Sequence, residues 1–416
     1  MALAGLCLLA ACGRPDRDPG ADPGAAAGAA SDETGDDPGF HDLGAFGYAD
    51  FGEEDAEADA GLAGVVLYDR ERSAPGYNLY VDIPFSAAYL IDAAGERVRA
   101  WREADDTTWV RAVLLDGGNL AVIGTGPAAG EVPEGGERQP FVARFGWEGA
   151  ELWRLEIAAH HDLDVLPTGD LLVLTERWSQ PPGEYEESGI RENVLTRISP
   201  GGEILGELAL YDLLAREEGL LRWTVQESKE GWPADLLHLN SVRWVDRPDL
   251  PADSPLSGTG RVLLSSRHQD LVFVVDWNAR ALLWSWGRGV VQRQHEATVL
   301  ESGNVLLFDN GSKKRRWSRI LELDPRTERI VWEYRADPPE DFYSSGRGTA
   351  QALPGGNVLV GNSASGEAFE VTREGKIVWR FLNPSRSEES GGRAALRIAR
   401  YPVERVERIR AERGER

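Results

Sequence analysis

An internal repeat constrains the fold of this 416-residue chain more than any other feature of its sequence. The repeated unit is an apolar segment, a short turn with a Gly-Asn or Gly-Asp step, and a second apolar segment. Glycine supplies the positive φ that tight hairpin turns need, and the apolar, partly β-branched flanks suit strands. We therefore predict four β-hairpins with closely similar sequences, at residues 112–123, 163–174, 297–308 and 350–361.

A second unit follows the first, with an apolar strand, a turn and a strand that carries tryptophan. It occurs at Tyr89–Trp101, Phe141–Trp153, Val272–Trp284, Ile320–Trp332 and Phe369–Trp379, with a version lacking tryptophan at Leu195–Leu208. The last three tryptophans recur about every 47 residues, and four short strands at that period are typical of a β-propeller blade. Six second units predict an all-β, six-bladed β-propeller over residues 60–392, closed by early strands near 65–67 and 77–81. The alternative is a stacked β-sandwich, which usually repeats less regularly.

The two ends of the chain lack this pattern. Residues 1–12 are largely apolar and end in Leu9-Ala10-Ala11-Cys12, which resembles the bacterial lipobox, where the cysteine is lipidated after cleavage. Residues 13–45 begin with a long stretch without large apolar side chains, so we expect a disordered N-terminal tether. We expect an exported protein, lipid-anchored through Cys12 at the bacterial cell envelope. Residues 393–416 are rich in Arg and Glu and are expected to form a short, charged, partly helical C-terminal extension with a break at Pro402.

Composition excludes several classes of function. The chain has 45 Lys and Arg against 69 Asp and Glu, a net charge of −24, which argues against nucleic acid as a partner because phosphate binding needs a basic surface. A small anionic substrate stays compatible, since a few focused cationic side chains can dominate the local field. The only cysteines are Cys7 and Cys12, so we expect neither a disulfide, a cysteine metal site nor a thiol nucleophile in the propeller.

Three of the six histidines occupy one position of the repeat. His161 and His295 each precede the turn Asp or Asn by nine residues, and His238 stands at the same strand start in the blade between them. The other blades carry Val110 and Gly348 at this position. Equivalent positions of successive blades surround a common axis, so the three histidines are expected to meet at one mouth of the central channel.

Two more polar residues are expected to join these histidines. If Val245 pairs with Arg261, then Leu239 pairs with Arg267, whose guanidinium would reach the His238 end of the sheet. Asn240 lies two residues after His238 and thus on the same face of the strand. Strand alternation places His268 on the opposite face, where we expect a surface residue.

This cluster has two chemical interpretations. Three histidines can bind zinc with an open coordination position, as a metal-dependent hydrolase would require. No repeat-equivalent carboxylate accompanies them, however, and a fixed Arg267 opposes a divalent cation. Arginine with histidines instead suits a tetrahedral oxyanion such as sulfate or phosphate, so we predict no metal site.

Ordered motifs around the cluster resemble those of the bacterial aryl-sulfate sulfotransferase family. They are His161-Asp with Pro-Thr-Gly-Asp, His238-Leu-Asn-Ser, Ser265-Ser-Arg267 with 272–276, and Gln294-His295-Glu with Phe308-Asp-Asn-Gly, and the resemblance covers about residues 60–405. It implies a six-bladed propeller that needs no nucleotide sulfate donor or other cofactor and moves a sulfuryl group between small-molecule phenols through a sulfated histidine. Some family members have an added N-terminal β-domain and a disulfide, which this sequence does not show.

The resemblance also implies a role for each residue of the cluster. His295 is expected to be the nucleophile, a choice that the shared repeat position alone does not make. His161, His238 and Arg267 would hold the sulfuryl oxygens, Asn240 would assist in substrate binding, and a neighbouring histidine would carry the phenol proton. The alternatives are a non-catalytic propeller that serves as a binding scaffold, and a quinone-dependent dehydrogenase propeller, for which vicinal cysteines are missing.

Overall fold

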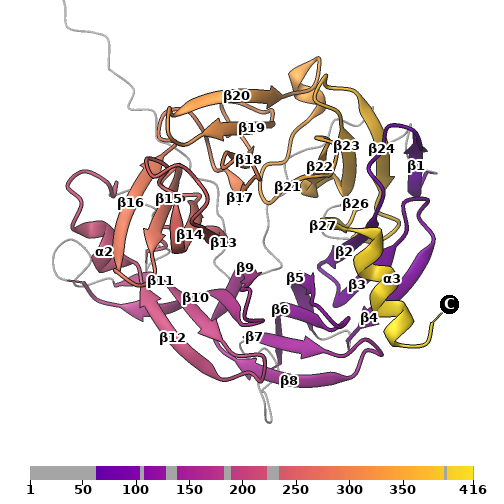
Figure 1. The fold of residues 1–416 in the computed structure, drawn as a ribbon, viewed down its shortest axis with the longest axis horizontal. Coiled ribbons are helices and arrows are strands. Elements are labelled where there is room, and N and C mark those ends of the chain that lie inside the picture. Colours follow the sequence, from indigo (N-terminus) through magenta and orange to yellow (C-terminus); the bar gives the residue numbers. More distant parts are fainter. Residues whose placement is uncertain are drawn as a thin grey trace, which may run out of the picture. The chain divides into compact units, whose positions relative to one another are not determined.

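The computed structural model describes residues 62–103, 107–127, 138–181, 189–222, 234–387 and 391–415. Within these residues, six antiparallel sheets surround a common axis (Figure 1), which confirms the predicted six-bladed β-propeller. Cys12 and the tether at 13–45 lie outside the described residues, so these predictions stay untested. Across the described ranges, the helices are all too short or too polar to cross a membrane.

Each blade has four strands that run from the channel to the rim, and we number the blades 1 to 6 around the ring. Blade 1 is β27 (Ala395–Tyr401), β2 (Tyr77–Ile83), β3 (Ala87–Ile91) and β4 (Arg97–Arg102); blade 2 is β5 (Thr108–Leu114), β6 (Leu120–Pro127), β7 (Arg138–Phe145) and β8 (Glu151–Glu156); blade 3 is β9 (Ala159–Val165), β10 (Leu171–Ser179), β11 (Ile190–Ile198) and β12 (Ile204–Ala209). Blade 4 is β13 (Leu239–Arg247), β14 (Gly258–Ser266), β15 (Leu271–Asp276) and β16 (Ala281–Trp286); blade 5 is β17 (His295–Val299), β18 (Val305–Asp309), β19 (Arg319–Asp324) and β20 (Arg329–Tyr334); blade 6 is β21 (Thr349–Ala352), β22 (Val358–Asn362), β23 (Glu367–Val371) and β24 (Ile377–Leu382).

The two ends of the described chain close the ring in opposite ways. Strand β27 pairs with β2 and becomes the innermost strand of blade 1. Strand β1 (Gly64–Tyr68) pairs with β24 and adds a fifth, outermost strand to blade 6. The propeller thus extends beyond residue 392, where we expected a separate C-terminal extension to begin. Alternation of buried side chains along 395–401 is weak because nearly all of them are buried, so this strand resembles the neighbouring charged segment more than a repeat.

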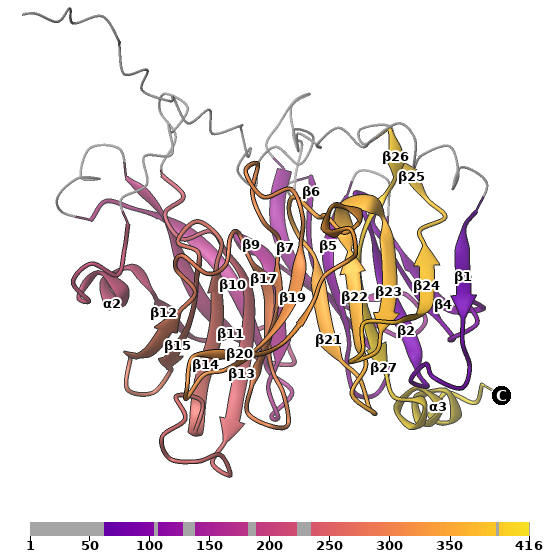
Figure 2. The same cartoon turned by 90° about the horizontal axis from the view of Figure 1, so that it is seen from above.

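The helical elements lie at the edges of the propeller. Helix α3 (Val403–Glu412) begins after Pro402 and packs below blades 1 and 2 through its buried Val406 and Ile409 (Figure 2). Arg405 Nη2 donates to the carbonyl of Leu114, at the end of β5 away from its first residue. The other short elements are α2 (Tyr211–Ala215), η1 (Pro339–Asp341), η2 (Ser363–Ser365), β25 (Arg386–Ser387) and β26 (Gly392–Arg393).

The predicted hairpins are present, with left-handed glycines at their turns. Gly169 and Gly303 have φ of 83° and 84°, a conformation that costs a residue with a Cβ about 1 kcal/mol or more. These turns fix the register in which strands of one blade pair.

Apolar side chains fill the spaces between adjacent blades. Six clusters of buried residues each join two neighbouring blades, so the core is a ring of interfaces around the channel. Since the channel itself needs no apolar filling, its polar residues are available for chemistry.

Candidate active site

Three inner strands of neighbouring blades bring the predicted histidines together. His161 lies in β9 of blade 3, His238 directly precedes β13 of blade 4, and His295 begins β17 of blade 5. The ring centroids of His161 and His238 are 4.7 Å apart. His161 and His238 have φ of 53° and 46°, a strained conformation for non-glycine residues that concentrates at functional sites.

A β-bulge changes the expected register at His238. Val245 pairs with Arg261 as predicted, but Leu239 pairs with Ser266 rather than with Arg267, because the register shifts at Asn240. Arg267 still reaches the cluster, since its backbone N–H donates to the carbonyl of His238 over 3.1 Å. Asn240 is buried, and its Nδ2 donates over 2.8 Å to the carbonyl of Gln294, the residue before His295.

His268 belongs to the cluster, and its predicted surface location is wrong. Its ring centroid lies 4.4 Å from that of His238, and its Nε2 is 2.9 Å from Nη1 of Arg267. Strand alternation fails here because residues 267–270 form the turn between β14 and β15. Within a turn, successive side chains do not alternate between two faces.

A carboxylate that lies outside the repeat also contacts the histidines. Asp235 Oδ2 is 2.5 Å from His238 Nδ1, and Asp235 Oδ1 accepts the backbone N–H of His238 over 3.0 Å. The sequence gave no signal for this contact, because Asp235 lies in the connection before β13 and occupies no repeat position. His160 is a further member, with its Nδ1 2.9 Å from Nδ1 of His161; the doubled histidine was its only signal.

The proton on His295 is placed by two carbonyl oxygens. His295 Nδ1 lies 2.7 Å from Asn310 Oδ1 and 2.9 Å from the carbonyl oxygen of Arg293. The Asn310 amide is oriented by its Nδ2, which donates to the carbonyls of Ser344 and Arg347. Because both neighbours of Nδ1 accept, Nδ1 carries the hydrogen. Nε2 is the basic nitrogen, and it accepts the backbone N–H of Arg347 over 3.2 Å.

Burial and positive charge keep several of these rings neutral. Burial, reinforced by Arg267, lowers the pKa of His295 to about 3. Burial and the neighbouring His238 lower the pKa of His268 to about 3 and that of His161 well below its usual value. Burial opposes ionisation of Asp235, but the adjacent His238 outweighs it and holds the pKa of this carboxyl well below its usual range. At neutral pH, His295 thus has the unprotonated nitrogen that a nucleophile needs.

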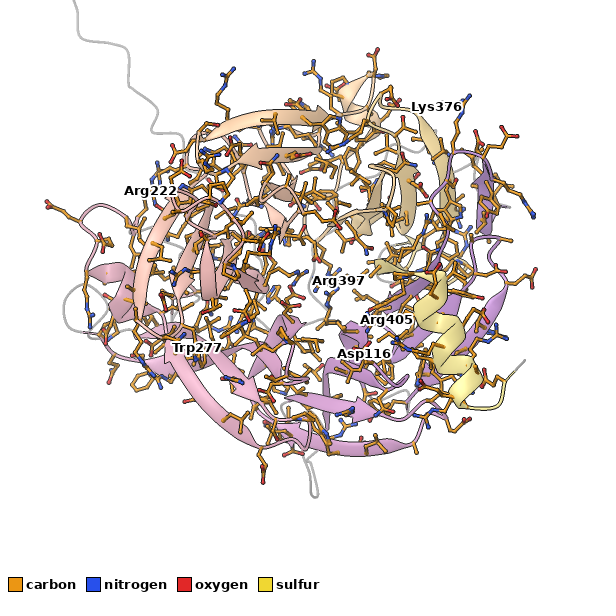
Figure 3. All side chains as sticks on the ribbon, in the orientation of Figure 1. Asp116, Arg222, Trp277, Lys376, Arg397 and Arg405 are labelled. Carbon is orange, nitrogen blue, oxygen red and sulfur yellow. The ribbon has the colours of Figure 1, made fainter. Side chains whose placement is uncertain are left out.

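A network of buried charges from five blades lies directly beside the histidines on the channel axis. Its cations are Arg397, Arg111 and Arg243, and its anions are Asp162 and Glu296, which follow His161 and His295 in the chain. Arg397 Nη2 lies 2.6 Å from Glu296 Oε2, and Figure 3 shows Arg397 near the centre of the ring. We did not predict this network, although Arg111, Asp162 and Glu296 share one repeat position, directly after Val110, His161 and His295.

One group of side chains has the spacing of a metal site. The ligand atoms of Asp235, His238 and His268 all lie within 4.8 Å of one another. The donors fit poorly, however, because Nε2 of His268 faces the Arg267 guanidinium and its Nδ1 lies 2.7 Å from the carbonyl oxygen of Asp235. A bound cation would have to replace one of these contacts and stand beside a fixed positive charge.

Solved structures share the fold of this chain at low sequence identity. A protein of unknown function from Bacteroides caccae is 13% identical, with a TM-score of 0.51 over 79% of this chain and 100% of that chain. A virginiamycin B lyase from Staphylococcus aureus is 10% identical, with a TM-score of 0.42 over 79% of this chain and 89% of that chain. No curated protein matches the sequence.

The comparison with protein families gives a specific result. The family described as Arylsulfotransferase (ASST) matches residues 141–384, more than half of the chain. The match spans the strands that carry His161, His238, Arg267 and His295. The resemblance predicted from the sequence motifs is confirmed, and the chain belongs to the arylsulfotransferase family.

Proposed function

We propose that this protein moves a sulfuryl group from a phenolic sulfate ester to a phenolic acceptor by a ping-pong mechanism through a sulfated His295. Membership of the family supports arylsulfotransferase activity in general. The observation that carries the finer proposal is the tautomer of His295, whose Nδ1–H is held by two carbonyl oxygens while Nε2 keeps its lone pair.

In the first half-reaction, Nε2 of His295 attacks sulfur in line with the leaving phenolate. The N–S bond forms as the S–O bond to the phenolate breaks, and a neighbouring histidine supplies the proton that the phenolate takes. The weak hydrogen bond from Arg347 N–H to Nε2 opens in this step. The sulfated ring carries positive charge at Nδ1–H, which the oxygens of Asn310 and Arg293 stabilise. In the second half-reaction, an acceptor phenol attacks sulfur, returns its proton, and restores His295.

The surrounding donors act on the sulfuryl oxygens. Arg267 offers a planar pair of N–H donors, which matches two oxygens of a tetrahedral anion. His161 and His238 stand beside it, and Asn240 assists substrate binding with Oδ1, which has no partner within the described ranges. Preorganised donors of this kind supply most of the catalysis in reactions that spread charge over oxygens.

Trapping the intermediate tests the proposal. The enzyme is incubated with 4-nitrophenyl sulfate without acceptor or nucleotide, and peptide mapping then locates the added sulfuryl group. We expect one acid-labile sulfuryl group on His295, and neither modification nor transfer in His295→Ala. A sulfuryl group on His161 or His238, or turnover by His295→Ala, would overturn the assignment, whereas an inert wild-type enzyme would favour a binding scaffold.

Metal-dependent hydrolysis is the second candidate, favoured by the spacing of Asp235, His238 and His268. It predicts stoichiometric zinc in the purified protein and loss of activity on chelation. Under the sulfohistidine proposal, chelators leave transfer intact.

We also propose that Cys12 is cleaved and acylated, so that the enzyme acts on small phenols outside the cytoplasm, anchored at the cell envelope. The support is the lipobox-like Leu9-Ala10-Ala11-Cys12. Mass spectrometry of the exported protein is expected to find a lipidated N-terminal Cys12, and an intact, unlipidated N-terminus would contradict the anchor.

A further inference from the structure

Asp235 contacts both histidines that flank the sulfuryl site on blade 4. Its carboxylate lies 2.5 Å from His238 Nδ1 and also accepts the backbone N–H of His238. Its main-chain carbonyl oxygen lies 2.7 Å from His268 Nδ1. One residue therefore holds two imidazole rings, one through its side chain and one through its backbone.

The carboxylate determines which nitrogen of His238 carries the permanent hydrogen. Both oxygens of an ionised carboxylate can only accept, so His238 Nδ1 donates to Asp235 Oδ2. The proton exchanged with a substrate is then the one on Nε2. An anion at Nδ1 also stabilises the imidazolium that forms when Nε2 takes a proton, the arrangement described for the Asp-His pair of serine proteases.

The contacts of His268 fix the Arg267 guanidinium. Because His268 Nδ1 donates to the Asp235 carbonyl, its Nε2 is an acceptor, and it lies 2.9 Å from Arg267 Nη1. One edge of the guanidinium is thereby held by protein. Arg267 is only 8% exposed, so its orientation is set by such contacts rather than by water.

We propose that Asp235 and His268 are positioning residues of this site: Asp235 fixes His238 as the acid and base that exchanges the phenol proton through Nε2, and His268 fixes the guanidinium of Arg267 against the sulfuryl oxygens. This assignment rests on the proposed function. The proton balance closes, because protonated His238 gives its Nε2 proton to the leaving phenolate as His295 is sulfated. His238 then takes a proton from the acceptor phenol as the N–S bond breaks.

The substitution Asp235→Asn tests the first half of the proposal. With Oδ1 still accepting the backbone N–H of His238, the new Nδ2 donates toward the ring and drives the ring hydrogen to Nε2. Phenyl sulfate, whose phenolate is strongly basic, needs the proton in the transition state, so we expect kcat/KM to fall about 10²–10⁴-fold. For 4-nitrophenyl sulfate, which releases a weakly basic phenolate, we expect a loss of less than about tenfold. Equal losses for both donors would overturn the role of Asp235. Asp212→Asn, an exposed residue on α2, is the matched control and leaves both rates unchanged.

The substitution His268→Phe tests the second half. It keeps a ring next to His238 but removes the acceptor for Arg267 Nη1. Since sulfuryl oxygens are present in every donor, we expect the same loss of kcat/KM for phenyl and 4-nitrophenyl sulfate, about 10–10²-fold. A loss confined to phenyl sulfate, or no loss at all, would contradict this role.

A spectroscopic measurement tests the contact without any turnover, which separates failure of this inference from failure of the proposed function. Nitrogen-15 correlation spectra of the imidazole rings are expected to show the hydrogen of His238 on Nδ1 in the wild type and on Nε2 in Asp235→Asn. An unchanged tautomer would overturn the inference even in an active enzyme. Stoichiometric zinc that is lost in Asp235→Asn would also overturn it, in favour of a metal centre.

Discussion

Arg267 is the one permanent cation in direct contact with the histidine cluster, and both its charge and its shape matter. Its Nη1 lies 2.9 Å from His268 Nε2, and its charge is one cause of the low pKa of His295. We expect Arg267→Ala to lower kcat/KM about 10²–10³-fold, by analogy with the loss of one oxyanion-hole donor. Arg267→Lys keeps the charge but loses the planar fork, so we expect an intermediate loss. Steady-state rates of both variants check this, and a lysine variant as poor as alanine would show that shape decides.

The neutral histidines make folding stability depend on pH. The pKa of His268 and of His295 is about 3 in the folded protein and about 6.5 in the unfolded chain. Between these values the unfolded chain binds more protons, so the free energy of unfolding falls as pH decreases. From pH 7 to 4.5 we expect a loss on the order of 2 kcal/mol for each such histidine. Urea denaturation at both pH values measures this, and His268→Phe is expected to lose less; an identical loss would contradict the burial argument.

Repetition decided which residues of the site could be predicted. His161, His238 and His295 share a repeat position, so their convergence followed from the symmetry of a propeller. Asp235 and His268 lie in connections between strands, where no period relates sequence to direction. Their contacts depend on how those connections fold over the mouth of the channel, which the sequence pattern does not encode.

At the scale of single elements, the periodic tryptophans join neighbouring blades. Four of them donate from Nε1 to a backbone carbonyl in a turn of the next blade: Trp101 to Gly146, Trp153 to Pro200, Trp332 to Arg373 and Trp379 to Ala93. This repeated contact is a physical reason for the period of about 47 residues seen in the sequence.

Trp379 makes the contact that links blade 6 to blade 1, and its ring is fully buried. We expect Trp379→Phe to lower the free energy of unfolding by about 1–3 kcal/mol, from the lost hydrogen bond and the smaller ring. Trp332→Phe is the matched control, because Trp332 is only half-buried, and it is expected to cost less than about 1 kcal/mol. Urea denaturation of both variants makes the comparison, and equal effects would show that burial is not decisive.

Strand positions were predictable because hairpin turns and tryptophans mark them, whereas two departures were not. The bulge at Asn240 shifts the partner of Leu239 by one residue, since an extra residue in one strand leaves no mark on an apolar pattern. The final strand of blade 1 also escaped prediction, because β27 pairs with a strand more than 300 residues earlier.

At the scale of the whole molecule, the charge network on the axis joins five of the six blades. Arg397, Arg111, Asp162, Arg243 and Glu296 come from blades 1 to 5 in order. Three cations face two anions, so the network has a net charge of +1 when all are ionised. Arginines lower the pKa of Glu296 to about 2 despite its burial, which keeps this carboxylate charged at neutral pH.

Removing one anion tests how far the ring depends on this network. Glu296→Gln leaves three arginines facing Asp162 alone, and breaking a buried ion pair in this way typically costs about 3–5 kcal/mol. We expect a loss of that size in the free energy of unfolding, measured by urea denaturation. The double variant Glu296→Gln with Arg397→Met restores the net charge of +1, so its loss is expected to be smaller than the sum of the two single losses by about 0.5–3 kcal/mol. Additive losses would mean that the five charges act independently and that the apolar interfaces between blades hold the ring without them.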